Sequence, residues 1–238
     1  MQTQLYFWKP LIEKHKEELS LVEKYYIRSK DIFNNIEKEA NDYANSLYKR
    51  YPATEDTDLL SVAEWAFEKG IEMYETLSAM KSTHLLMTIV MLYHIWEQQL
   101  IRFTINELEH YLEFDEKFLK FEEVQKIFEL HGVDIKKTEA WEKIKELKLL
   151  ANTIKHAEGY SATELRKIRP DFFKVDVIIG DVDILELNRA VLLDGDSLQV
   201  NERDLMEYIN AVRSFWDEMP ERAYADVNTI INVLTPKK

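Results

Sequence analysis

Apolar residues recur every three or four positions along most of this chain, with charged residues between them. Over residues 8–51 this spacing predicts one long amphipathic helix or two consecutive ones. Pro52 and the acidic segment ATEDTD interrupt the pattern. Asp58 or Ser61 is then suitably placed to cap a helix that continues to about Met80.

The same periodicity predicts three further helices in the middle of the chain. The first, residues 83–114, is apolar on all sides over its first turns, which is typical of a central core helix. The second, residues 116–131, is followed by Gly132 in a C-terminal capping position. The third begins at Thr138 and is expected to run to about residue 157, with Gly159 ending it.

The remaining third of the chain mixes helix and strand signals. Residues 161–164 match a capping box for a short helix that Pro170 stops. VDVIIGDVDI and VLLDGDSLQV are rich in β-branched residues, so residues 175–200 predict two short strands, with Asp194-Gly195 as the turn. Asn201 is placed to cap a last helix through Trp216, and a weakly structured tail is expected after it, at residues 227–238.

These elements predict a mainly all-α fold, a multi-helix bundle with a small β-hairpin near residues 175–200. We expect a single helical domain over residues 1–238, with N-terminal helices in 1–80, a core in 81–170, and the hairpin and C-terminal helix in 171–220. The composition agrees, because 46% of the residues are hydrophobic and only 5 Gly and 5 Pro are present.

The composition and the motifs of the chain also limit its expected cellular location and the kinds of binding site that it can contain. The chain has no cysteine, and its first residues do not resemble a signal peptide, so we expect a cytoplasmic protein. The most apolar stretch, residues 85–96, is shorter than the roughly 20 residues that span a bilayer, which predicts no membrane contact. Phosphate-binding loops, dinucleotide fingerprints and standard metal-ligand spacings are absent, so neither a cofactor nor a metal is expected.

Charge is distributed unevenly along the sequence. The net charge of −13 opposes broad binding to nucleic acid, yet residues 141–174 carry eight basic against five acidic residues. Asn152 and His156 lie in this basic region, four positions apart and therefore on one helical face. An amide that orients a ligand and an imidazole that exchanges protons would suit acid–base chemistry on a phosphodiester.

In this pattern the chain resembles the HEPN superfamily, all-α proteins in which an Arg, usually followed by a polar residue, precedes a His at the end of a helix. Asn152 matches the polar residue and His156 the His, but Ala151 occupies the Arg position. The resemblance implies a metal-independent ribonuclease that acts as a dimer, with His156 and Asn152 as catalytic residues. Three cations could contact the substrate in place of the missing Arg: Lys148, Lys155 and Arg166.

Two functions follow from these observations. The leading one is RNA cleavage, or RNA or nucleotide binding, in a toxin–antitoxin system or phage defence, with RNA or a protein from the same operon as partner. The alternative is a noncatalytic helical module for protein–protein interaction or dimerisation. Trp141 and Leu149, on the face of their helix opposite its core stripe, predict a homodimer in either case.

A second polar cluster interrupts the apolar helix of residues 83–114. It consists of His94, Glu97, Gln98 and Arg102. One interpretation is structural: a buried ion pair where the helix leaves the core. The other places the cluster in a pocket, as the second wall of a site with Asn152 and His156.

Overall fold

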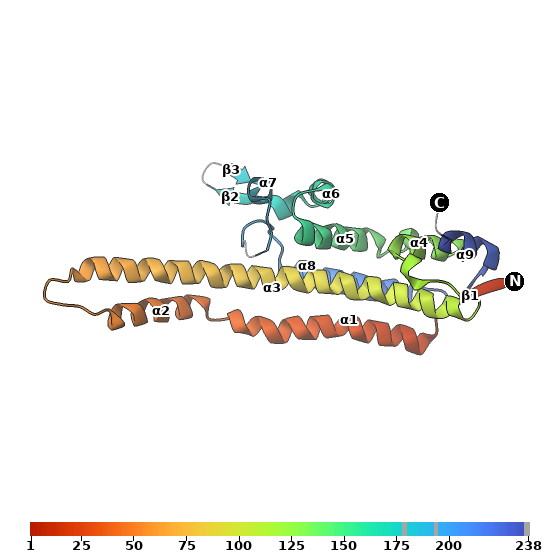
Figure 1. The fold of residues 1–238 in the computed structure, drawn as a ribbon, viewed down its shortest axis with the longest axis horizontal. Coiled ribbons are helices and arrows are strands. Elements are labelled where there is room, and N and C mark those ends of the chain that lie inside the picture. The colour runs from red at the N-terminus through yellow and green to blue at the C-terminus, as the bar shows by residue number, and fades with distance from the viewer. Residues whose placement is uncertain (178–179, 193–194, 236–238) are drawn as a thin grey trace. The chain divides into compact units, whose positions relative to one another are not determined.

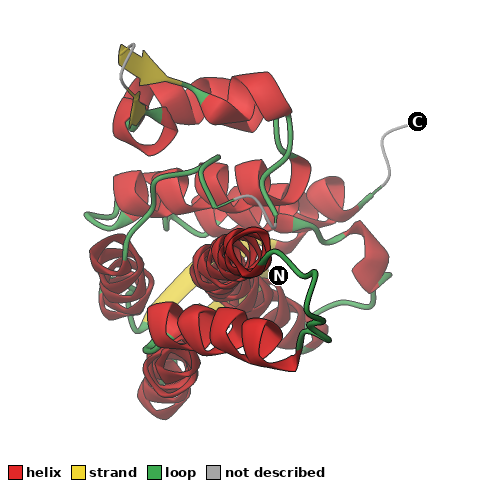
Figure 2. Cartoon of the chain, turned by 90° about the vertical axis from the view of Figure 1, so that its left-hand side faces the viewer, coloured by secondary structure: helices red, strands yellow, loops and turns green. Residues whose placement is uncertain are grey.

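The computed structural model describes residues 1–177, 180–192 and 195–235, and it is mainly α-helical, as the sequence predicts (Figures 1 and 2). The α-helices are α1 (Lys9–Ser29), α2 (Ile36–Arg50), α3 (Leu59–Glu109), α4 (Phe121–Leu130), α5 (Trp141–His156), α6 (Tyr160–Ile168), α7 (Ile184–Asn188), α8 (Glu202–Asp217) and α9 (Val227–Leu234). The strands are β1 (Gln2–Tyr6), β2 (Val175–Val177), β3 (Gly180–Val182) and β4 (Arg222–Asp226). Single 3-10 turns occupy Lys30–Phe33, Glu116–Phe118, Ile135–Lys137 and Pro170–Phe173.

The chain forms two compact units, each assembled from segments that are distant in sequence. The first unit contains Met1–Lys24, Thr88–Ala151 and Asn201–Lys238. The second unit contains Tyr25–Met87 and Asn152–Val200. Three helices, α1, α3 and α5, therefore contribute residues to both units. Among the described residues, no helix is both long enough and apolar enough to cross a bilayer.

An aromatic core holds the first unit together. Trp96 of α3 packs edge-on against Phe215 of α8, with ring centroids 5.3 Å apart. The buried amide of Gln99 accepts a hydrogen bond from Nε1 of Trp216 (3.1 Å) and donates one to the main-chain carbonyl of His15 (3.1 Å). One polar side chain thus connects α1, α3 and α8 inside an otherwise apolar core.

The prediction of a weakly structured C-terminal tail is wrong. β4 pairs antiparallel with β1, from Gln2 opposite Asp226 to Tyr6 opposite Arg222, and α9 follows directly. The side chain of Asp226 caps α9 by accepting a hydrogen bond from the Asn228 amide (2.8 Å). Because the two strands lie more than 200 residues apart in sequence, no local pattern could reveal their pairing.

The predicted break near residue 80 is also wrong. α3 is one continuous helix of 51 residues that passes through Ser82 and Thr83. Ser82 or Thr83 could cap a new helix only if the backbone before it were not helical. No Gly or Pro interrupts the helix at this point, so the backbone continues as one helix. The cap at Asp58 is confirmed, since its carboxylate accepts a hydrogen bond from the Leu60 amide (3.0 Å).

The hairpin is smaller than predicted. β2 and β3 pair within residues 175–182, and residues 184–188 form α7. The described part of 191–200 contains no strand, and Asp194, half of the predicted turn, lies outside the described residues. The capping box proposed for residues 161–164 is wrong as well, because α6 already begins at Tyr160. The cap at Asn201 is confirmed, and the structure adds a reciprocal partner, Asp204, which completes a capping box.

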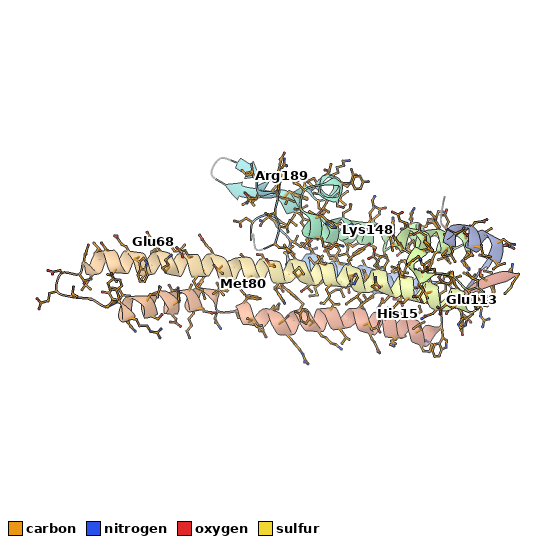
Figure 3. All side chains as sticks on the ribbon, in the orientation of Figure 1. His15, Glu68, Met80, Glu113, Lys148 and Arg189 are labelled. Carbon is orange, nitrogen blue, oxygen red and sulfur yellow. The ribbon has the colours of Figure 1, made fainter. Side chains whose placement is uncertain are left out.

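In the second unit, α2 folds back along the first half of α3 (Figure 1). Small residues allow α2 and α3 to approach each other closely. A Cβ built on Gly70 would lie 2.9 Å from the Cβ of Ala44, and Ala40 is buried in the same interface. Val62 and Ala66 of α3 are buried as well, whereas Glu68 and Met80, which Figure 3 labels, are exposed.

Candidate functional site at the end of helix α5

The Asn152 and His156 side chains lie on the last two turns of α5, as predicted. Lys155 and His156 are exposed, and Asn152 is half-buried. The helix ends at His156, and the next residue, Ala157, has a left-handed φ of 55°, so the chain turns there and not at Gly159. A cation in the last turn interacts favourably with the helix dipole, which would by itself account for Lys155.

The helix α6 starts only four residues after His156. Its N-cap is Gly159, which has no side chain to accept a hydrogen bond from the first-turn amides. Tyr160, the first residue of α6, is 79% exposed. Nothing in the local sequence indicated a role for Tyr160, because a single tyrosine at a helix start gives no periodic signal. Exposed Lys155 and His156 thus lie in the last turn of α5, and exposed Tyr160 opens α6 four residues after His156. We call these residues and the N-terminus of α6 the α5–α6 corner.

Arg166 is not available to replace the missing arginine. Its guanidinium donates hydrogen bonds to both carboxylate oxygens of Glu158, and its Nε donates to Asp183 (2.6 Å). The hydrogen bonds to these carboxylates raise the pKa of Arg166, and Glu158 has the larger effect. The guanidinium also lies 4.5 Å from the centre of the Phe173 ring. Two carboxylates neutralise this cation, so the predicted substrate contact would require breaking a network that joins α6 to the start of α7.

The other two residues named with Arg166 have different environments. Lys148 is half-buried, and its ammonium lies 4.6 Å from the centre of the Phe121 ring, a cation–π contact inside the first unit. It lines a hollow of about 350 Å3 together with Trp141 and Lys145. Lys155 is exposed and forms no salt bridge with any described residue. Of the three predicted cations, Lys155 is therefore the one best placed to meet a ligand beside His156.

Position 151 points into the protein. Ala151, where the family resemblance expects an arginine, is fully buried. A guanidinium at this position would have to enter the core or displace the helix. The Ala151 side chain therefore packs inside the protein.

The second polar cluster divides into separate environments. His94 and Arg102 are exposed, so the predicted buried ion pair is wrong. Glu97 accepts a hydrogen bond from the hydroxyl of Tyr93 (2.9 Å), and burial of that phenol raises the pKa of Tyr93. Gln98 and Arg102 line a groove of about 320 Å3 between α1 and α3.

The wall of this groove contains a buried histidine. The ring of His15 stacks on Trp216 with centroids 4.7 Å apart, and its Nδ1 lies 3.6 Å from a carboxylate oxygen of Glu18. Burial lowers the pKa of His15, which favours its neutral form. Both ring nitrogens are buried and make no hydrogen bond with described residues, so they are inaccessible to a ligand in the groove.

Comparison with family models, curated proteins and solved structures gave no match for this chain. Among the described residues, no cluster of three His, Asp or Glu side chains has the arrangement of a metal site. The function therefore has to be inferred from the residues of the α5–α6 corner.

Proposed function

We propose that this protein binds single-stranded RNA at the α5–α6 corner and that His156 is the group that catalyses slow, metal-independent cleavage of the bound strand. The observation that carries the proposal is the exposure of Lys155, His156 and Tyr160, which lie within six residues of one another in the chain, next to an α6 N-terminus without a side-chain cap. Each of these features suits a different part of a nucleotide.

The phosphate would meet the first turn of α6. Amide groups at a helix N-terminus point outward and carry partial positive charge, which attracts phosphate oxygens. Gly159 leaves these amides without a side-chain cap, and the Lys155 ammonium adds a full positive charge nearby in sequence. A local site of this kind can bind a phosphate even though the whole chain carries a net charge of −13.

The base would stack on Tyr160. An exposed aromatic ring provides a surface for any base, and such stacking contributes about 1 to 3 kcal/mol per base. The Tyr160 ring is 79% exposed, so its surface is open to a base.

His156 would act on the ribose. As a general base it would accept the proton of the 2′-hydroxyl, whose oxygen then attacks phosphorus while the bond from phosphorus to the 5′-oxygen breaks. The leaving oxygen takes up a proton from the protonated imidazole or from water. Asn152 would orient the imidazole or the phosphate. Because Ala151 is buried and Arg166 is held by two carboxylates, neither position supplies a free guanidinium to stabilise the charge that develops on the phosphate, and we expect slow cleavage.

The noncatalytic interaction module remains the second candidate. The buried Ala151 and the neutralised Arg166 favour it, because both remove a feature on which catalysis in the HEPN superfamily depends. A homodimer through Trp141 and Leu149 is compatible with either function. A role in phage defence or a toxin–antitoxin system rests on the family resemblance alone.

The test measures binding and cleavage separately. A fluorescein-labelled single-stranded RNA of about ten nucleotides is titrated with the protein in EDTA, and the same mixture is followed for cleavage. Tyr160→Ala should weaken binding at least fivefold, and His156→Ala should remove cleavage with little change in binding. His94→Ala, which changes an exposed histidine of α3, is the matched control. Failure of the wild-type protein to bind or cleave RNA would favour the interaction module.

A further inference from the structure

A stripe of large apolar side chains lies exposed on the first half of α3. Leu60 is 69% exposed and Phe67 64%, and Ile71 and Tyr74 are each more than 40% exposed. Their spacing of 7, 4 and 3 residues places them on one side of the helix. Single exposed apolar residues are ordinary, but a row of four along one helical face is typical of a surface that another helix covers.

This stripe forms one wall of a groove whose other wall is α2. Phe67, Gly70, Ile71 and Tyr74 of α3 face Glu37, Ala40, Asn41 and Ala44 of α2 across a hollow of about 220 Å3. A second hollow of about 430 Å3 continues the groove and shares Glu37 and Tyr74 with the first. The small side chains of Gly70 and Ala44 form the floor, where the two helices approach closely. The α3 residues that line the two hollows run from Phe67 to Lys81, and with Leu60 the apolar stripe and the groove together span about 30 Å, the length of a helix of about 20 residues.

The charge around the groove is predominantly negative. Residues 36–80 contain ten acidic and four basic residues. Glu37 lies in the groove itself, and exposed Glu64 follows Leu60 by four positions, beside the stripe. Neither carboxylate forms a salt bridge with any described residue. Lysines line only the far end, where Lys38 and Lys81 flank the second hollow.

We propose that this groove, which we call the α2–α3 groove, binds a basic amphipathic helix of a partner protein. The apolar face of that helix would cover Phe67, Ile71 and Tyr74, and the result would be a three-helix bundle. Its Lys and Arg side chains would lie near Glu37 and Glu64. This surface is separate from the α5–α6 corner, and the inference does not depend on RNA binding.

Charge distinguishes this occupant from a second copy of the chain. Two copies joined through this groove would bring two segments with an excess of six acidic residues each into contact, and such juxtaposition of like charges opposes association. A basic helix gains from the same charges, which steer it toward the groove at low salt.

The experiment uses a synthetic helical peptide as the probe. The peptide has about 21 residues, with leucine at the two apolar positions of each heptad and lysine at the others, and its twin has glutamate in place of every lysine. We expect the lysine peptide to bind the full-length protein with one-to-one stoichiometry and the glutamate peptide not to bind. Fluorescence anisotropy at several salt concentrations gives both affinities.

Variants decide whether the peptide occupies the groove. Phe67→Ser should weaken binding at least tenfold, while Met80→Ser, on an exposed residue that does not line the groove, should leave it unchanged. Glu37→Gln should weaken binding about threefold or more. Glu39→Gln is the matched control, since Glu39 lies in the same first turn of α2 but does not line the groove.

Three results would overturn the proposal. The first is no binding of the lysine peptide at 50 mM salt. The second is equal binding by wild type, Phe67→Ser and Glu37→Gln, because this would show attraction to the overall negative charge alone. The third is a concentration-dependent dimer in sedimentation velocity that Phe67→Ser converts to monomer, because a second copy would then occupy the groove. All of the altered side chains are exposed, so loss of folding should not confuse the outcome.

Discussion

Replacement of Gly70 by alanine tests how closely α2 and α3 pack. Two effects oppose each other. Alanine is favoured over glycine in a helix interior by up to about 1 kcal/mol. A Cβ at position 70, however, would lie 2.9 Å from the Cβ of Ala44 and 3.4 Å from the carbonyl oxygen of Ala40, so one helix must move. Overpacking of this kind costs about 1 to 3 kcal/mol.

The steric cost therefore equals or exceeds the gain in propensity, and we expect Gly70→Ala to destabilise the docking of α2 by up to about 2 kcal/mol. Because α2 buries little apolar surface, the loss should appear as local opening. Amide hydrogen exchange measured across α2 should accelerate by up to about 30-fold, since each 1.4 kcal/mol corresponds to a factor of ten. Amides of α8 in the first unit serve as the internal reference.

A second substitution separates the clash from other effects. Ala44→Gly removes the atom that the new Cβ would meet and alone costs about 1 kcal/mol of helix propensity. If the clash is real, the double variant should be more stable than the sum of the two single changes predicts. Slower exchange in Gly70→Ala than in wild type, or strict additivity in the double variant, would refute the close approach of α2 and α3 on which the α2–α3 groove depends.

Three further predictions concern the first unit. Burial lowers the pKa of His131, so folding favours the neutral imidazole. The contribution of His131 to stability is therefore present above about pH 6.5 and is lost as the pH falls. His131→Gln should reduce the fall in melting temperature between about pH 7.5 and 5.5. If the melting temperature of His131→Gln falls with pH as steeply as that of wild type, this role of His131 is wrong. Gln99→Leu removes the acceptor for Nε1 of Trp216 and should cost about 1 to 3 kcal/mol in denaturant unfolding, whereas the same change at its less buried neighbour Gln98 should cost much less. Asn201→Ala removes the capping box of α8 and should cost about 0.5 to 2 kcal/mol, while Asn201→Ser should retain most of the stability; equal losses in both would argue against a capping role.

Sequence by itself determined the elements whose signals are local. Apolar periodicity identified most of the helical segments, because each helix must bury one face, but it did not identify the short helices α7 and α9. Asn201 and Asp58 were recognisable as caps because a side-chain acceptor and the amides that it satisfies lie within three residues of each other. The positions of Asn152 and His156 on the last turns of α5 followed from the same local rule.

Only the tertiary structure decided the features that depend on distant segments. The pairing of β1 with β4 joins the two ends of the chain, and nothing near either strand encodes its partner. The same holds for Arg166: the sequence shows a cation near His156, but only the fold brings Asp183 to its Nε and so removes it from the candidate site. Exposure is the third such property, because a helical stripe such as Leu60, Phe67 and Tyr74 looks the same in sequence whether it lies in a core or faces solvent. Local chemistry sets which residues can cap, turn or form a helix, while burial and charge pairing depend on what the rest of the chain places beside them.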